Sequence, residues 1–144
     1  EMDSHRLEQN NLRFQAKYKE LKANEVRYEE IRCDDAEYIL VAFGTSSRVC
    51  LKAIDLLRDK GIRAGLLRPI TLYPFPSGII AERSRQVKGF MSVEMSSGQM
   101  VEDIKLAVYD AGHVIPVKHF GRMGGLLPTP GEVVDALISN FLIS

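Results

Sequence analysis

The chain has 144 residues, of which 45% are hydrophobic and 26% charged, and its 19 basic and 19 acidic side chains give a formal net charge of zero. This balance provides no basic surface for nucleic acid or an anionic membrane, so neither is expected as a partner. The apolar runs are far shorter than the roughly 20 residues of a membrane span, and no signal peptide is visible. We therefore expect one compact, cytoplasmic domain with an appended element.

The two cysteines, Cys33 and Cys50, lie far apart in the sequence and lack the spacing of a zinc site or a disulfide framework. We interpret them as buried free thiols in a reducing compartment. The chain begins with Glu1 rather than methionine, which is compatible with a fragment of a longer protein.

Residues 1–27 are rich in charged and amide side chains. Leu7, Phe14 and Leu21 recur at heptad spacing with Tyr18 between the last two, which predicts one apolar face of a helix. This helix either connects to a neighbouring domain or a second copy of the chain, or lies on its own domain. The pattern leaves both interpretations open.

The first half of the remaining chain has an alternating strand and helix pattern. Residues 28–33 form a short predicted strand, and residues 38–43 are uniformly apolar, as in a parallel strand buried on both faces. Residues 47–60 have a helical pattern, and residues 62–67 form a further apolar run. Together these segments predict a strand–helix–strand unit of an α/β domain.

Capping residues mark the ends of two predicted helices. The hydroxyls of residues 45–47 are expected to cap the first helix, and Gly61 suits the position just after its end. The last helix begins with a capping box, in which Thr129 is the N-cap, Pro130 the first helical residue and Glu132 the third.

Residues 68–76 hold three of the six prolines and separate the two halves of the pattern. Proline fixes its own φ and biases the preceding residue toward extended conformations. We expect the strand over residues 62–67 to stop here and the chain to enter a helix over residues 77–87.

The second half repeats the alternation. Residues 90–94 read as a strand buried until its last residue, Glu94, and residues 114–120 as another, followed by the glycine-rich loop 121–125. The helix between these strands should end before Gly112 and bury Met100, Ile104, Ala107 and Val108. The last helix should bury Val133, Val134, Leu137, Ile138 and Phe141.

In a doubly wound sheet, ligands approach the carboxyl ends of the strands. Polar side chains follow four predicted strands at such ends: Thr45, Ser46, Arg68, Glu94, Gln99 and Arg122. Hydroxyls at a helix N-terminus beside an arginine could hold phosphate or carboxylate. Alternatively, the hydroxyls cap the helix, and Arg68, Glu94 and Arg122 pair with one another or with a partner surface.

The signature motifs of other catalytic classes are missing: GxGxxG, GxxxxGK[ST], HExxH and GxSxG do not occur. His113 and His119 are the histidines of the second half, and nothing in the sequence marks a carboxylate or nucleophile as their partner. We interpret both as structural.

Four ordered motifs carry a resemblance to a known family. They are Asp34-Asp35-Ala36-Glu37 with the strand ending at Gly44, Leu67 to Pro76 (LRPITLYPFP), Glu94 to Met100 (EMSSGQM), and Gly124-Gly125 before Pro128-Thr129-Pro130. Over about residues 28–142 the chain resembles the C-terminal domain, core domain II, of the alpha subunit of 2-oxoacid:ferredoxin oxidoreductases. It is most similar to the 2-oxoisovalerate (branched-chain) type.

The resemblance implies a fold like the transketolase C-terminal domain. This is a three-layer α/β/α sandwich with a five-stranded sheet that is parallel apart from its antiparallel first strand, here residues 28–33. Residues 1–27 would be a linker helix from a thiamine-related domain, and residues 28–144 the domain itself.

The resemblance also implies a complex that decarboxylates a 2-oxoacid on thiamine diphosphate with Mg²⁺. Electrons pass through iron–sulfur clusters to ferredoxin, and the acyl group passes to coenzyme A. Cluster ligation needs sets of cysteines, and the Gly-Asp-Gly diphosphate motif does not occur. In the family these cofactors belong to other domains and subunits, so no catalytic, cofactor-binding or metal residue is assigned to this chain.

Two functional hypotheses follow. In the first, the domain serves assembly, and Tyr73 and Phe75 are apolar anchors that meet other domains, other subunits or a second copy of the chain. The alternative for these two aromatic residues is burial in the domain's own core. In the second hypothesis, Thr45, Ser46, Arg68 and Arg122 make the chain a stand-alone module that binds small anions or nucleotides.

Overall fold

The computed structural model describes residues 26–95, 98–122, 124 and 126–143. The linker helix predicted over residues 1–27 therefore lies outside the described residues, except for its last two positions. Gly125 of the glycine-rich loop also lies outside them. Among the described helices, none is long and apolar enough to cross a membrane.

Five strands form one sheet in the order β1-β3-β2-β4-β5. The strands are β1 (Tyr28–Ile31), β2 (Tyr38–Val41), β3 (Ala64–Pro69), β4 (Gly89–Glu94) and β5 (Val117–Gly121). β1 pairs antiparallel with β3, whereas the other neighbours pair in parallel. The predicted mostly parallel sheet with an antiparallel first strand is confirmed.

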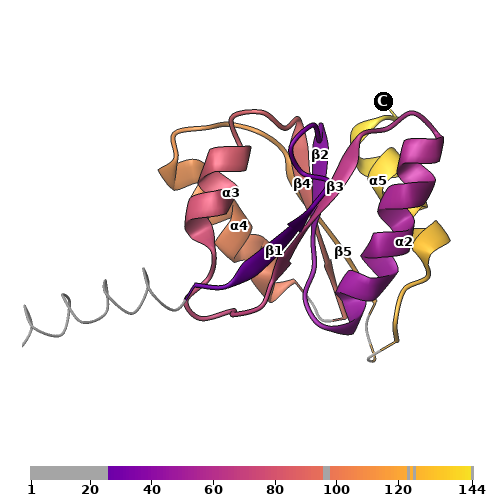
Figure 1. Ribbon diagram of the computed structural model, residues 1–144. Helices are drawn as coiled ribbons and strands as arrows, with labels where there is room; N and C mark the ends of the chain where they lie inside the picture. Colours follow the sequence, from indigo (N-terminus) through magenta and orange to yellow (C-terminus); the bar gives the residue numbers. More distant parts are fainter. Residues whose placement is uncertain (1–25, 96–97, 123, 125, 144) are drawn as a thin grey trace, which may run out of the picture.

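The helices cover both faces of this sheet (Figure 1). They are α2 (Thr45–Asp59), α3 (Ser77–Arg83), α4 (Gln99–Asp110) and α5 (Pro130–Phe141). α2 packs against α5 on one face, and α3 packs against α4 on the other. The three-layer α/β/α sandwich is therefore also confirmed.

β2 lies at the centre of the sheet, and all four of its residues are buried. Ile39 and Val41 belong to the core beneath α3 and α4, while Tyr38 and Leu40 belong to the core beneath α2 and α5. Alternate side chains of a strand point to opposite faces, so a strand covered on both sides has to be apolar throughout.

Several predicted boundaries differ from the structure, among them those of β3, α3 and β5. β3 continues through Arg68 and Pro69 instead of stopping before them, because its last residues pair with β1, with Pro69 opposite Tyr28. α3 ends at Arg83, four residues early, and turns follow it. β5 begins at Val117 rather than at residue 114, directly after Pro116, whose carbonyl accepts a hydrogen bond from β4.

The predicted hydroxyl caps of α2 are wrong. Gly44, with φ of 59°, is the N-cap, and no side chain caps the helix. The helix therefore starts at Thr45, and the three hydroxyl residues form its first turn; Ser47 donates back to the Gly44 carbonyl instead. The capping box of α5 is confirmed, because Thr129 and Glu132 exchange both expected hydrogen bonds.

Candidate functional site

The carboxyl ends of β2, β3, β4 and β5 lie at one edge of the sheet because these strands are mutually parallel. We call this side of the domain the carboxyl edge. The chain passes from β2 to β3 on one side and then crosses to β4 on the other, so the topological switch point lies between β2 and β4. Open α/β sheets bind their ligands at such a point.

Thr45 and Ser46 lie at this switch point, at the start of α2. The Thr45 hydroxyl is 3.5 Å from the Met95 sulfur and so connects the loops that follow β2 and β4. Ser46 is buried. Thr45 and Ser46 are the first residues of α2 and so form a helix N-terminus. The two arginines expected near them form ion pairs with other residues.

Arg68 and Arg122 each pair with a glutamate. Arg68 Nη1 lies 3.4 Å from Glu29 Oε2, its directly opposite neighbour on β1. Arg122 Nε lies 3.4 Å from Glu132 Oε2. Hydrogen bonds from Thr129, helped by the Arg122 charge, hold the pKa of Glu132 below its ordinary value. The expected pairing of Arg68, Glu94 and Arg122 with one another does not occur.

Glu94 is buried, with 3% of its surface exposed, which corrects the prediction that the strand is buried only up to this residue. The reason lies in α4: Glu94 Oε1 accepts a hydrogen bond of 3.0 Å from the Met100 backbone N–H in its first turn. A carboxylate at a helix N-terminus is favoured by the helix dipole. Gln99, the first residue of α4, is exposed.

His119 on β5 faces the same carboxylate. Its Nδ1 atom lies 3.3 Å from Glu94 Oε2 and 2.8 Å from the Ser92 hydroxyl. Oε2 has no hydrogen-bond partner of good geometry among the described residues. Sequence patterns predict a structural role for His119 and indicate no carboxylate partner for it. The signal that could have revealed Glu94 is its two-residue spacing from Ser92, which places both side chains on one face of β4.

The cluster of Ser92, His119 and Glu94 is not arranged for nucleophilic catalysis. Ser92 is fully buried, so its hydroxyl cannot reach a substrate. A Cβ atom added at Gly98 would lie 3.3 Å from the imidazole ring, so the absence of a side chain there leaves room for His119. The arrangement joins the end of β4, the start of α4 and the middle of β5.

Tyr73 and Phe75 differ in environment although only two residues separate them. Phe75 is buried, at 8% exposure, in the core beneath α3 and α4, whereas Tyr73 is 71% exposed. Phe75 therefore serves the domain's own core. Tyr73 faces outward at the carboxyl edge, and the peptide bond that joins it to Pro74 is cis.

Other exposed apolar side chains follow the same strand ends. Together with Tyr73 they form a set that we call the edge patch: Phe43, Ile70, Leu72, Tyr73, Leu126 and Leu127. They come from the connections that leave β2, β3 and β5. These connections all leave the sheet at the carboxyl edge.

The family model for pyruvate:ferredoxin oxidoreductase core domain II matches residues 36–133 of this chain. The chain belongs to this family. The match covers β2 through the first turn of α5, and with them nearly the whole core domain II fold.

Curated relatives give the same result for core domain II. The chain is 52% identical over 126 residues to ketoisovalerate oxidoreductase subunit VorB of Methanothermobacter marburgensis, covering 88% of this chain and 35% of the relative. It is 47% identical over 136 residues to the subunit of the same name from Methanothermobacter thermautotrophicus, covering 94% and 38%. The chain therefore spans little more than a third of these relatives.

Solved structures share the fold. A 2-oxoglutarate:ferredoxin oxidoreductase from Magnetococcus marinus, with 2-oxoglutarate, coenzyme A and succinyl-CoA bound, superposes with a TM-score of 0.81 at 17% identity, covering 98% of this chain and 24% of that one. A split-gene transketolase, an inactive beta4 tetramer, superposes with a TM-score of 0.60 at 20% identity, covering 80% and 36%.

The described part of core domain II does not fit the metal groups that the resemblance implies. It holds no group of three or more histidine, cysteine or acidic side chains that could bind a metal ion. Cys33 and Cys50 are buried in the cores on opposite faces of the sheet, so they cannot ligate one cluster. Burial raises the pKa of both thiols to about 12, whereas a metal ligand must be a thiolate.

Proposed function

We propose that this chain is core domain II of a ketoisovalerate-type ferredoxin oxidoreductase, and that its role there is assembly rather than catalysis. The identities of 52% and 47% to ketoisovalerate oxidoreductase subunits support this substrate type. In the complete complex, thiamine diphosphate, Mg²⁺ and iron–sulfur clusters are held by other domains and subunits, which also receive ferredoxin and coenzyme A. The chain alone is inactive.

The observation that carries the proposal is the edge patch. Six large apolar side chains are exposed where three strands end, and none of them belongs to either buried core. Interfaces are enriched in such aromatic and aliphatic anchors, and Tyr73 is the most exposed of them.

The occupant of the edge patch is the remainder of the oxidoreductase subunit. Nearly two thirds of each VorB relative lies outside the matched region, so the domain has a large covalent neighbour in those proteins. Interfaces between domains of one chain commonly bury a mixed surface of this kind.

A charge placed in the edge patch tests the proposal. Leu72→Lys and the matched control Leu51→Lys change the same residue type at nearly equal exposure, 44% and 42%, but Leu51 lies on α2 away from the patch. Each variant is expressed in the complete subunit together with the other subunits. The measurements are complex formation by size-exclusion chromatography and 2-oxoisovalerate-dependent reduction of ferredoxin.

We expect Leu72→Lys to lower complex formation and activity together, with the circular dichroism and thermal stability of the isolated domain unchanged. Leu51→Lys should assemble like the unmodified chain. Equal assembly of the two variants would contradict the assembly role.

The second hypothesis, a stand-alone module for small anions, has a separate test. Calorimetry of the chain with phosphate, thiamine diphosphate and coenzyme A should give no saturable heat. Saturable binding that is lost on Thr45→Ala or Arg122→Ala would favour that hypothesis over assembly.

A further inference from the structure

The imidazole of His119 has one nitrogen in the interior and the other at the surface. Nδ1 lies 2.8 Å from the Ser92 hydroxyl and 3.3 Å from Glu94 Oε2, and both of these residues are buried. Nε2 has no hydrogen-bond partner among the described residues. In that part of the chain, Glu94 Oε2 is the buried polar side-chain atom without a partner, so the unpartnered Nε2 is open to solvent.

The interior contacts decide which nitrogen carries the proton of the neutral ring. Glu94 Oε1 already accepts the Met100 N–H, whereas Oε2 faces Nδ1 of His119. A lone pair on Nδ1 would place two acceptors against each other in the interior, and buried groups without a donor are costly. A proton on Nδ1 removes this conflict, and the Ser92 hydroxyl can accept it. Nε2 then keeps the lone pair.

The start of α4 holds the ring in this orientation. Gly98 is the N-cap of α4, and a Cβ atom added there would lie 3.3 Å from Nε2 and 3.3 Å from Cδ2 of His119. Glu94 is joined to the same turn of α4 by its hydrogen bond from Met100. The ring cannot turn Nε2 inward without losing the contacts of Nδ1, so the fold fixes Nε2 as the outward nitrogen.

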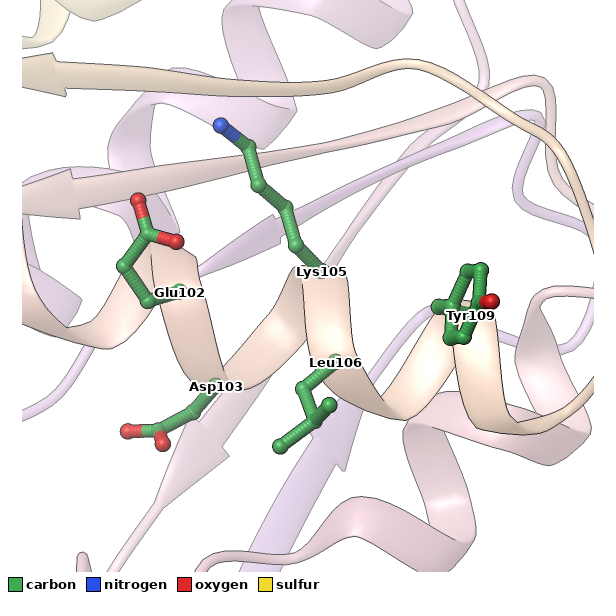
Figure 2. A pocket seen from close by; sticks show the side chains of 5 residues that line it. All are labelled: Glu102, Asp103, Lys105, Leu106 and Tyr109. Carbon is green, nitrogen blue, oxygen red and sulfur yellow. The ribbon is translucent and has the colours of Figure 1, made fainter.

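The charges around the ring favour a cation at Nε2. The Glu94 carboxylate lies behind the imidazole, and Glu102 follows Gly98 by four residues, which places it one turn further on the same side of α4. Lys105 projects to the same side of α4 as Glu102 and offsets one of these two carboxylates (Figure 2). Lys118 points to the other face of the sheet, because alternate residues of a strand do so. One negative charge remains in excess.

A hollow of about 420 Å³ lies on the outside of α4. It is lined by Glu102, Asp103, Lys105, Leu106 and Tyr109, all of which project from this one helix (Figure 2). Sites for small molecules bury most of the ligand surface, which a single helix cannot do. We therefore expect the group that reaches Nε2 to be a side chain of another part of the protein.

We propose that Nε2 of His119 is a hydrogen-bond acceptor for a cationic side chain, an arginine or a lysine, from the remainder of the oxidoreductase subunit. Glu94 is the positioning residue, because it keeps the proton of the ring on Nδ1. The identity of the occupant rests on the assembly role proposed above, whereas the protonation of the ring does not depend on it.

Nitrogen-15 NMR of the chain with labelled imidazoles tests the acceptor directly. His119 should carry its proton on Nδ1, and its signals are assigned by their loss in His119→Gln. A ring protonated on Nε2, or on both nitrogens at pH 7, would overturn the proposal.

Two variants test why the proton lies on Nδ1. In Glu94→Gln the side-chain carbonyl can keep the Met100 N–H, so the amide NH₂ group faces Nδ1 and the proton should move to Nε2. Ser92→Ala is the control, because it removes the hydroxyl and leaves the carboxylate, so the proton should stay on Nδ1. A proton that stays on Nδ1 in Glu94→Gln would contradict the role of Glu94.

Chemical modification tests whether Nε2 is covered in the complete complex. Diethyl pyrocarbonate acylates an accessible imidazole nitrogen that carries a lone pair. It should modify His119 in the chain alone and several-fold more slowly in the assembled complex, as measured by peptide mass spectrometry. Equal rates in the two samples would overturn the assignment of the remainder of the subunit as the occupant.

The sign of the charge on the occupant is tested at the same position. His119→Gln offers a carbonyl oxygen as acceptor, whereas His119→Lys repels a cationic donor. Each variant is placed in the complete subunit, and the thermal stability of the isolated domain is measured to detect a folding defect. His119→Lys should lower complex formation several-fold relative to His119→Gln, and less so in high salt. The opposite order would mean an anionic occupant and would overturn the proposal.

Comparison with the edge patch separates this proposal from the assembly role. Impaired assembly in Leu72→Lys together with normal assembly in His119→Lys would leave the assembly role intact and reject the site at His119. Normal assembly in both variants would reject both.

Discussion

The imidazole of His119 lies against the one buried carboxylate of the described chain, with Nδ1 at 3.3 Å from Glu94 Oε2. The other oxygen of Glu94 is already satisfied by the Met100 N–H. The imidazole of His119 is therefore the polar group that lies against Oε2 in the interior. Loss of this imidazole would also leave the buried Ser92 hydroxyl without its His119 partner, and a buried polar atom without a partner costs more than the hydrogen bond itself contributes.

His119→Leu should lower the free energy of unfolding by about 1–3 kcal/mol. The matched control is His113→Leu, which lies after α4 outside this cluster and should change the free energy of unfolding much less. Urea denaturation of both variants measures the difference. An equal decrease in the free energy of unfolding for both variants would show that the contact of His119 with Glu94 contributes little to stability.

Phe75→Ala should destabilise the domain by about 3–5 kcal/mol, because it opens a cavity in the core beneath α3 and α4. Tyr73→Ala removes an aromatic ring of similar size from an exposed position and should cost well under half as much. Thermal and urea denaturation of the two variants provide the comparison. A Tyr73→Ala variant as unstable as Phe75→Ala would contradict the difference in burial between the two rings.

Gly65 lies in β3, where a Cβ atom would come within 2.7 Å of the Arg32 carbonyl oxygen and 3.0 Å of the Cys33 Cα. Both are backbone atoms that cannot rotate away, so Gly65→Ala should cost about 1–3 kcal/mol. Gly78 lies in α3 with open space around it, and Gly78→Ala should stabilise the domain by about 0.5 kcal/mol. A gain of stability in Gly65→Ala would refute the packing argument.

The Arg58 guanidinium makes a bidentate contact with the Asp35 carboxylate. Nη2 lies 2.7 Å from Oδ1, and Nη1 lies 3.1 Å from Oδ2. These hydrogen bonds hold the pKa of Asp35 below its ordinary value of 3.8. The Asp35 carboxylate is therefore protonated at a higher pH in the unfolded chain than in the folded chain. The stabilisation that its contact with Arg58 gives the fold is complete above about pH 4 and is lost as the pH falls further.

Asp35→Asn should consequently be less stable than the unmodified chain at pH 7, with a difference that shrinks as the pH falls from about 4 to about 2. Urea midpoints measured over this range give the two curves. A constant difference between them would mean that the contact with Arg58 does not depend on the charge of Asp35.

Local pattern predicted much of the fold. The apolar run before Gly44 predicted a strand covered on both sides, and β2 is such a strand. The four residues from Thr129 to Glu132 predicted a capping box because its hydrogen bonds join near neighbours in sequence. Gly44 was harder to interpret, because a glycine with positive φ can end a strand or begin a helix.

The interior of the candidate site could not be predicted in the same way. The contact of Glu94 with His119 depends on the register of β4 and β5, which places Ser92 opposite His119 across 27 residues of sequence. The exposure of Tyr73 and the burial of Phe75 depend on the path of the loop after β3. Composition contains no information on that path.

β1 lies at one side of the sheet with no further strand beside it among the described residues, and its two glutamates point to opposite faces. Glu29 pairs with Arg68 on β3, and Glu30 pairs with Arg83 on α3, with Nε 2.6 Å from Oε2. A strand from another molecule that hydrogen-bonded to this edge would have to bring its own side chains against both ion pairs. Free strand edges are starting points for aggregation, and charged side chains protect them. At high protein concentration this side of the domain should therefore resist amyloid-like growth of the sheet.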